Sequence, residues 1–157
     1  MVEQNLLQAY PAGMPEEQVW RLGRDVAGAL VQWEKQGIVH QAVKPQNVFV
    51  TEGGFRLGEP ARSNMPCGGD LSCMCPEMYW GEGFDSRADV YAVGLLLHTV
   101  LGGEKIADLR RLEGETLSRP NGSEKLVSIV MRACAYEPKE RFASVEAMAK
   151  ALERENG

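Results

Sequence analysis

The 157-residue sequence lacks the features that mark several large classes of protein. It has no dense cluster of Lys and Arg and a formal net charge of -5, so the phosphate backbone of a nucleic acid is a poor partner. Its longest apolar stretch, Val90 to Leu101, is too short to cross a bilayer. The N-terminus does not show a basic segment followed by an apolar one. We therefore expect no binding to nucleic acid or membrane, and a cytoplasmic location.

Cysteine is also scarce. Cys67, Cys73, Cys75 and Cys134 are too few and too unevenly spaced for a disulfide framework, so reduced thiols are expected. Three of them lie close together in the sequence, but they lack the paired C-x-x-C spacing of a strong zinc site. We predict no metal site, and keep a zinc-stabilised interaction domain as an alternative.

What is present indicates one mainly helical domain with a small amount of β structure. The 44% of hydrophobic and 25% of charged residues are typical of a globular protein of this length. Between residues 15 and 36, apolar residues recur at the three-and-four spacing of a helix that buries one face. Two short β-prone runs flank Glu52-Gly53-Gly54 and predict a hairpin over 48–57.

The second half of the chain predicts a loop and then further helices. Residues 58–75 are rich in Gly, Pro, Ser and Cys and show no periodicity. After them, Ser86 is placed to cap a helix and Asp89 to reach back to the cap. The helix that follows is apolar nearly all round, so we expect it to be central and buried. Ser123 and Ser144 precede two more amphipathic segments and predict their N-caps.

Several stretches, in this order, resemble the C-terminal lobe of Ser/Thr protein kinases. His40-Gln41-Ala42-Val43-Lys44-Pro45-Gln46-Asn47 is similar to the kinase catalytic loop, and Cys75-Pro76-Glu77 to the Ala-Pro-Glu motif. Residues 85–94 look like the start of the large central helix, with Asp89 as a structural residue. Glu137 to Phe142 resembles a Pro-x-x-Arg segment, and the resemblance implies a buried ion pair between Arg141 and Glu77.

The resemblance implies one kinase C-lobe-like helical domain, mainly α (α+β), over residues 1–157. Its expected parts are a hinge and first helix (1–14), a long helix (15–36), a catalytic-loop-like segment (38–47, hereafter the 38–47 loop), the hairpin (48–57), an activation-segment-like stretch (58–77, hereafter the 58–77 segment) and a helical remainder (78–157). We find no Gly-rich phosphate loop or strand Lys in the sequence, and expect the N-lobe to be absent.

The kinase-like loop departs from the family pattern where the chemistry is done. Ala42 occupies the position of the Asp that deprotonates the substrate hydroxyl, and a methyl group cannot accept a proton. Gln41 replaces the preceding Arg, and Glu59 stands where the magnesium-binding Asp is expected. Lys44 and Asn47 match the phosphate-contacting Lys and the second magnesium ligand.

Two further residues complete the predicted site. The resemblance makes His40 a packed residue that braces the loop. We expect Asp70 to lie too far from Asn47 to replace the missing magnesium ligand. We therefore expect no bound ATP or magnesium, and retain Lys44, Asn47 and Glu59 only as vestigial positions.

From these departures we predict a pseudokinase that is not an enzyme and that acts as a protein-binding or regulatory module. The expected contact is a protein partner or a second copy, through the edge that an N-lobe normally covers. Leu6, Leu7, Val48, Phe49 and Leu57 lie in the segments that form this edge. The main alternative is a fragment of an active Ser/Thr kinase.

Overall fold

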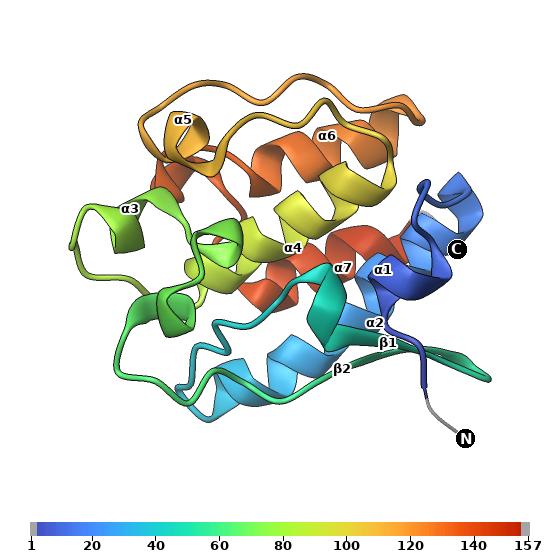
Figure 1. Cartoon of the computed structure of the whole chain (residues 1–157), viewed down its shortest axis with the longest axis horizontal. Helices are drawn as coiled ribbons and strands as arrows, with labels where there is room; N and C mark the ends of the chain where they lie inside the picture. Colours follow the sequence, from blue (N-terminus) through green and yellow to red (C-terminus); the bar gives the residue numbers. More distant parts are fainter. Residues whose placement is uncertain (1–2, 155–157) are drawn as a thin grey trace.

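The computed structural model describes residues 3–154, which form a helical body with one small sheet at its side (Figure 1). The helices are α1 (Leu6–Ala9), α2 (Glu16–Lys35), α3 (Pro76–Tyr79), α4 (Arg87–Val100), α5 (Asp108–Leu112), α6 (Glu124–Ala133) and α7 (Val145–Arg154). The strands are β1 (Val48–Thr51) and β2 (Gly54–Leu57). Short 3-10 turns lie at Pro45–Asn47, Pro66–Gly69, Leu71–Cys73 and Pro138–Glu140.

The helix α2 begins and ends where its flanking residues dictate. Pro15 precedes it in an extended conformation, and Glu16 and Glu17 place negative charge at the positive end of the helix dipole. Gly37, just beyond the end, has φ of 74°, a conformation that glycine adopts without steric cost. The helix therefore lies within one residue of the predicted range at each end.

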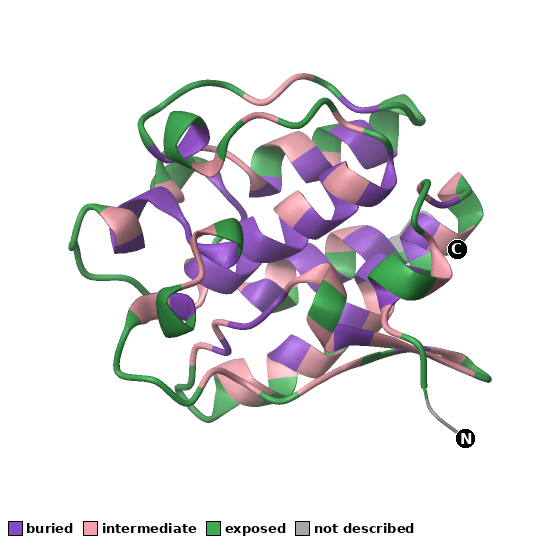
Figure 2. Cartoon of the chain, in the orientation of Figure 1, coloured by how far each residue is buried: buried purple, intermediate pink, exposed green. Residues whose placement is uncertain are grey.

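The core lies where α4 and α2 meet α6 and α7, and Figure 2 shows buried residues concentrated along α4. Most residues of α4 are buried, as its apolar sequence predicts. Its Gly94 lies so close to α6 that a Cβ there would come within 2.8 Å of the Ala133 Cβ. Within residues 3–154, no helix is both long enough and apolar enough to span a membrane.

The hairpin joins two antiparallel strands whose alternate residues face opposite sides. Val48 pairs with Leu57, and Val50 pairs with Phe55. These four side chains pack against the core. Phe49 lies outside this core, with the Arg56 guanidinium over its ring.

The free edge of β1 is covered by the start of the chain. The Val50 amide donates to the Gln4 carbonyl oxygen at 2.9 Å, and Asn5 forms an antiparallel bridge with Phe49. These contacts seat α1 beside the hairpin. Leu6 is buried there, and Leu7 is exposed.

The predicted capping box at the start of α4 is wrong. Ser86 occupies the N-cap position, but its hydroxyl makes no cap bond and donates to Glu34 at 2.5 Å. Asp89 accepts hydrogen bonds from the backbone amides of His40 and Gln41. The carboxylate is buried beside two amides that have no strand partner, and satisfying them there outweighs a local cap.

The other two predicted caps are present. The Ser123 hydroxyl accepts from the Leu126 amide at 3.3 Å, and the Ser144 hydroxyl accepts from the Ala147 amide at 3.0 Å. These bonds satisfy amides in the first turns of α6 and α7.

Candidate functional site

His40 is a buried brace at the start of the 38–47 loop. Its Nδ1 accepts from the Ala42 amide at 3.1 Å, so Nε2 carries the proton and donates to the Gly58 carbonyl oxygen at 2.8 Å. Burial lowers the pKa of His40. A neutral ring therefore ties the loop to the end of β2.

Asp89 holds the backbone of the 38–47 loop at His40 and Gln41. Gln41 has φ of 67°, an uncommon value for a residue with a side chain. The Asp89 carboxylate holds the amides of His40 and Gln41 at 2.7 and 3.1 Å. Burial raises the pKa of Asp89 to about 6, although these two hydrogen bonds favour its charged form. The strained backbone persists because α4 supplies an acceptor directly beneath it.

Asn47 closes the loop from its other end. Its Nδ2 donates to the carbonyl oxygens of Ala42 and Glu59, both at 2.9 Å. A Cβ on Gly58 would lie 2.1 Å from the Asn47 Oδ1, so only glycine allows this approach. Ala42 itself is 8% exposed, and both of its backbone polar groups are bonded within the loop.

Lys44 pairs with a carboxylate that lies far from it in the sequence. Its Nζ lies 2.8 Å from Asp70 Oδ2, and the Ser72 hydroxyl donates to the other oxygen of Asp70 at 2.7 Å. The hydrogen bond to Asp70 is the main cause that raises the pKa of Lys44. Burial raises the pKa of Asp70, but its bonds from Lys44 and Ser72 outweigh this effect and lower it. Asp70 therefore forms an ion pair with Lys44 of the 38–47 loop, which its sequence position did not suggest.

Glu77 and Arg141 form a bidentate ion pair at the end of the 58–77 segment. The guanidinium nitrogens lie 2.7 and 2.8 Å from the two carboxylate oxygens, and the side chains are 5% and 0% exposed. Arg141 also donates to the carbonyl oxygens of Ala135, Tyr136 and Arg87. Satisfying every donor in this way is what makes burial of the charges tolerable.

Comparisons with known proteins agree with this arrangement. No protein-family model matches the chain. The serine/threonine-protein kinase Pkn1 of Myxococcus xanthus is 28% identical over 156 residues, covering 82% of this chain and 22% of the relative. PknI of Mycobacterium tuberculosis, also a serine/threonine-protein kinase, is 29% identical over 159 residues, covering 98% of this chain and 27% of the relative. The chain thus spans about a quarter of the length of these relatives.

A solved structure extends the likeness to three dimensions. The crystal structure of the M. tuberculosis PknI kinase domain matches with a TM-score of 0.73 and 26% identity. The match covers 99% of this chain and 63% of that domain. This chain is a protein kinase-like C-lobe.

The kinase relatives confirm the predicted fold and correct one expectation. We predicted that the chain is not an enzyme, on the strength of Ala42 and the missing N-lobe. That classification is wrong, because the relatives that match most of the chain are protein kinases. The comparisons therefore indicate a relation to protein kinases, which are enzymes.

Arg111 is a residue of the kinase-like C-lobe that sequence reasoning missed. It is buried, and it donates to the carbonyl oxygens of Leu71 at 2.6 Å and Met74 at 2.7 Å. It also donates to the Tyr91 hydroxyl at 3.1 Å. These bonds fasten the 58–77 segment to α5 and α4. Arg111 follows Arg110 in a stretch rich in charged residues, which gives no local signal of such a role.

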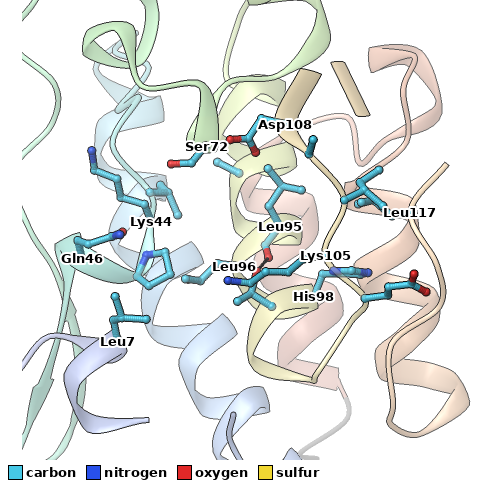
Figure 3. Close-up of a pocket in the computed structure, with 17 residues that line it drawn as sticks. Leu7, Lys44, Gln46, Ser72, Leu95, Leu96, His98, Lys105, Asp108 and Leu117 are labelled. Atoms are coloured by element: carbon cyan, nitrogen blue, oxygen red, sulfur yellow. Dashed lines mark hydrogen bonds between the residues drawn. The ribbon is translucent and has the colours of Figure 1, made fainter. Parts of the chain in front are cut away.

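A groove of about 390 Å³ opens beside the 38–47 loop. Figure 3 shows Leu7, Lys44 and Gln46 along one side of it and His98 and Leu117 along the other. The His98 Nε2 lies 2.8 Å from the Ser118 carbonyl oxygen, which holds that ring at the wall. The remaining lining residues are Val43, Pro45, Ser72, Ala92, Leu95, Leu96, Thr99, Glu104, Lys105, Ile106, Ala107 and Asp108.

The structure does not supply a set of ligands for the zinc site of the alternative hypothesis within residues 3–154. Among residues 3–154, no group of three or more His, Cys, Asp or Glu side chains is placed to hold a metal ion. Cys67, Cys73 and Cys75 are all buried, but Cys75 lies at the N-cap of α3, where its neighbours are Glu77 and Met78.

Proposed function

We propose that this kinase-like C-lobe is of the pseudokinase type and acts as a protein-binding or regulatory module. The observation that carries the proposal is Ala42. A methyl group fills the position of the catalytic base, and general-base help contributes about a hundred- to ten-thousand-fold to a rate. The backbone at this position is held in place, because the amide and the carbonyl oxygen of Ala42 are hydrogen-bonded to His40 and Asn47.

The two family residues that could hold nucleotide and metal are used to build the loop. Lys44 is paired with Asp70, and the Asn47 amide nitrogen bridges Ala42 and Glu59. Phosphoryl transfer depends on positioned cations around the phosphates. Groups already satisfied by the protein support a structural role for the loop, and we propose no bound ATP or magnesium.

The surface that we assign to a partner is the edge formed by α1, the 38–47 loop and the hairpin. Leu7 is 47% exposed on this edge, and it also lines the groove of Figure 3. The groove combines apolar side chains such as Leu95 with polar ones such as Gln46. That mixture suits an extended peptide segment with an apolar anchor, from another protein or from a second copy of the chain. A cytoplasmic location remains a prediction.

Light scattering across a concentration series tests the second-copy form of the proposal. The variants Leu7→Glu and Phe49→Glu place charge on the proposed edge. Leu109→Glu is the matched control, because the Leu109 side chain is exposed on α5. Leu57 is unsuitable because its side chain packs against the core.

We expect the two edge variants to weaken association at least tenfold and the control to leave it unchanged. If the parent is monomeric, binding of a library of extended peptides to the parent and to Leu7→Glu tests the groove directly. A monomeric parent that captures no peptide contradicts the proposal.

The alternative, a fragment of an active Ser/Thr kinase, is favoured by one contact. The Asp70 carboxylate lies 2.8 Å from Lys44 and brings an acceptor to the loop that lacks its Asp. Incubation with labelled ATP, magnesium and generic substrates separates the two functions. We expect no label from the parent or from Ala42→Asp, since one restored group cannot supply the missing positioning. Label that disappears in Asp70→Asn but persists in Arg110→Ala would establish the alternative.

A further inference from the structure

Two cysteines of the 58–77 segment lie close together beneath an exposed turn. Cys67 and Cys73 are 4% and 2% exposed and belong to one buried cluster with Met78 and Tyr91. The Cys67 thiol donates to the Cys73 carbonyl oxygen at 3.2 Å, which places the Cys67 sulfur against the backbone of Cys73. Gly68 and Gly69, between them, are exposed to solvent. Only a thin turn therefore separates the pair from solvent.

The backbone of that turn explains why the two cysteines lie close together. Cys67, Gly68 and Gly69 have successive φ values of 53°, 64° and 85°. This left-handed run reverses the chain, and the two glycines adopt it without steric cost. Cys67 does carry a side chain, so its conformation is strained and must be held by its surroundings.

Gln41 supplies that hold from the 38–47 loop. Its side-chain Oε1 accepts from the Cys67 amide at 3.0 Å, and its carbonyl oxygen accepts from the Cys73 thiol at 3.7 Å. One residue of the 38–47 loop thus contacts both cysteines. A change in the position of either cysteine would therefore alter the hydrogen bonds of Gln41.

The two thiols differ in their readiness to ionise. The interaction with Cys67 lowers the pKa of Cys73 against the effect of burial, with help from Lys44 and Arg111. The same interaction raises the pKa of Cys67. Burial raises the pKa of Cys75 and of Cys134 to about 12. Cys73 is therefore the thiol best suited to act as a nucleophile.

We propose that Cys67 and Cys73 form a reversible disulfide on exposure to a peroxide, and that this bond locks the turn against Gln41. The Cys73 thiolate attacks one peroxide oxygen, the O–O bond breaks, and hydroxide leaves as Cys73 becomes a sulfenic acid. The Cys67 sulfur then attacks the Cys73 sulfur, the S–O bond breaks, and water leaves. The two thiol protons end in the two molecules of water formed. A small-molecule dithiol reverses the reaction by exchange.

Intact-mass measurement after treatment with hydrogen peroxide tests the proposal. Cys67, Cys73 and Cys75 all fall in one tryptic peptide, from Ser63 to Arg87, so the variant Cys75→Ser/Cys134→Ser is used to leave one pair. We expect this variant and the parent each to lose two hydrogen atoms per chain, and dithiothreitol to restore them. Cys73→Ser should lose none, and Cys67→Ser should hold a dimedone-reactive sulfenic acid at Cys73.

Three results would overturn the proposal: no loss of hydrogen under conditions that oxidise free glutathione, a bond that contains Cys75, or a bond between two chains. Circular dichroism checks that the variants fold. If a single variant fails to fold, alkylation of the native parent decides. We expect iodoacetamide to modify Cys73 at least tenfold faster than Cys134, and equal rates would contradict the assignment.

Discussion

Two ion pairs hold the 58–77 segment, and they differ in every respect that sets their energy. Glu77 and Arg141, at its end, form a bidentate pair that is almost fully buried. Lys44 and Asp70, at its middle, make a single contact with side chains that are 27% and 36% exposed. The first pair joins α3 to the turn that precedes α7, and the second reaches the 38–47 loop.

The comparison distinguishes residues that hold the fold together from residues of the 38–47 loop, where the kinase pattern places the catalytic groups. The family positions that fasten the segment to α3 and the last helices are retained with all their partners. At the positions that the kinase pattern assigns to phosphoryl transfer, Ala42 departs from the pattern and Asn47 makes hydrogen bonds within the protein. Breaking the buried pair of Glu77 and Arg141 leaves an unpaired buried charge, so it should cost more free energy than breaking the partly exposed pair of Lys44 and Asp70.

The largest expected effect comes from breaking the buried pair. Arg141→Ala leaves the Glu77 carboxylate buried without a partner and should lower the free energy of unfolding by about 3 kcal/mol. Urea denaturation measures this change, with Arg110→Ala, which breaks the exposed pair with Glu115, as the control. An Arg141→Ala protein as stable as the parent would show that the pair does not hold the fold.

A somewhat smaller effect is expected where α4 packs on α6. A Cβ at Gly94 would lie 2.7 Å from the Cys134 sulfur, so Gly94→Ala should destabilise the protein by about 1 to 3 kcal/mol. Gly28 in α2 is the matched control, because no atom lies within 4 Å of its added Cβ. Gly28→Ala should instead stabilise by about 0.5 to 1 kcal/mol. Thermal unfolding of both variants checks the contrast, which fails if they shift in the same direction.

Asp89 links the two regions, because it lies on α4 and holds the 38–47 loop. Asp89→Asn turns one acceptor into a donor that faces a backbone amide, at a cost of about 1 to 3 kcal/mol at pH 4. The folded pKa of about 6 lies above the usual value of 3.8, so the native state binds the proton more tightly than the unfolded state. The contribution of Asp89 to stability is therefore full below about pH 4 and falls as the pH rises through 6.

The variant has no such titration, so its stability relative to the parent should improve between pH 4 and 6. Denaturation curves of both proteins across this range measure the difference, in which the contributions of other titrating groups, such as His40, largely cancel. A difference that is constant with pH would contradict the raised pKa.

The smallest effect is expected at the exposed pair. Lys44→Ala should change the free energy of unfolding by less than about 1 kcal/mol, because solvent screens a partly exposed pair. A double-mutant cycle with Asp70→Asn isolates the interaction. A coupling as large as that between Glu77 and Arg141 would remove the distinction between the two regions.

Local patterns in the sequence were enough to predict most elements of the fold. Apolar spacing and flanking signals predicted α2, and the glycine-rich turn predicted the hairpin. The same reasoning failed at Ser86 and Asp89. Their side chains hydrogen-bond to residues far away in the sequence and do not form the local capping box. It could not say which face of the hairpin points inward, because Phe49 and Val50 have similar hydrophobicity.

The sequence by itself determined the order of the main helices, the presence of Ala42 where the kinase pattern has Asp, and the pairing of Glu77 with Arg141, since each depends on local periodicity or on a family motif. Only the tertiary structure decided that Asp70 pairs with Lys44, that Arg111 binds the 58–77 segment and that the Cys67 thiol contacts the Cys73 backbone. Those contacts depend on the path of a loop without periodicity. Such a path is set by the buried polar groups that it must satisfy across the fold.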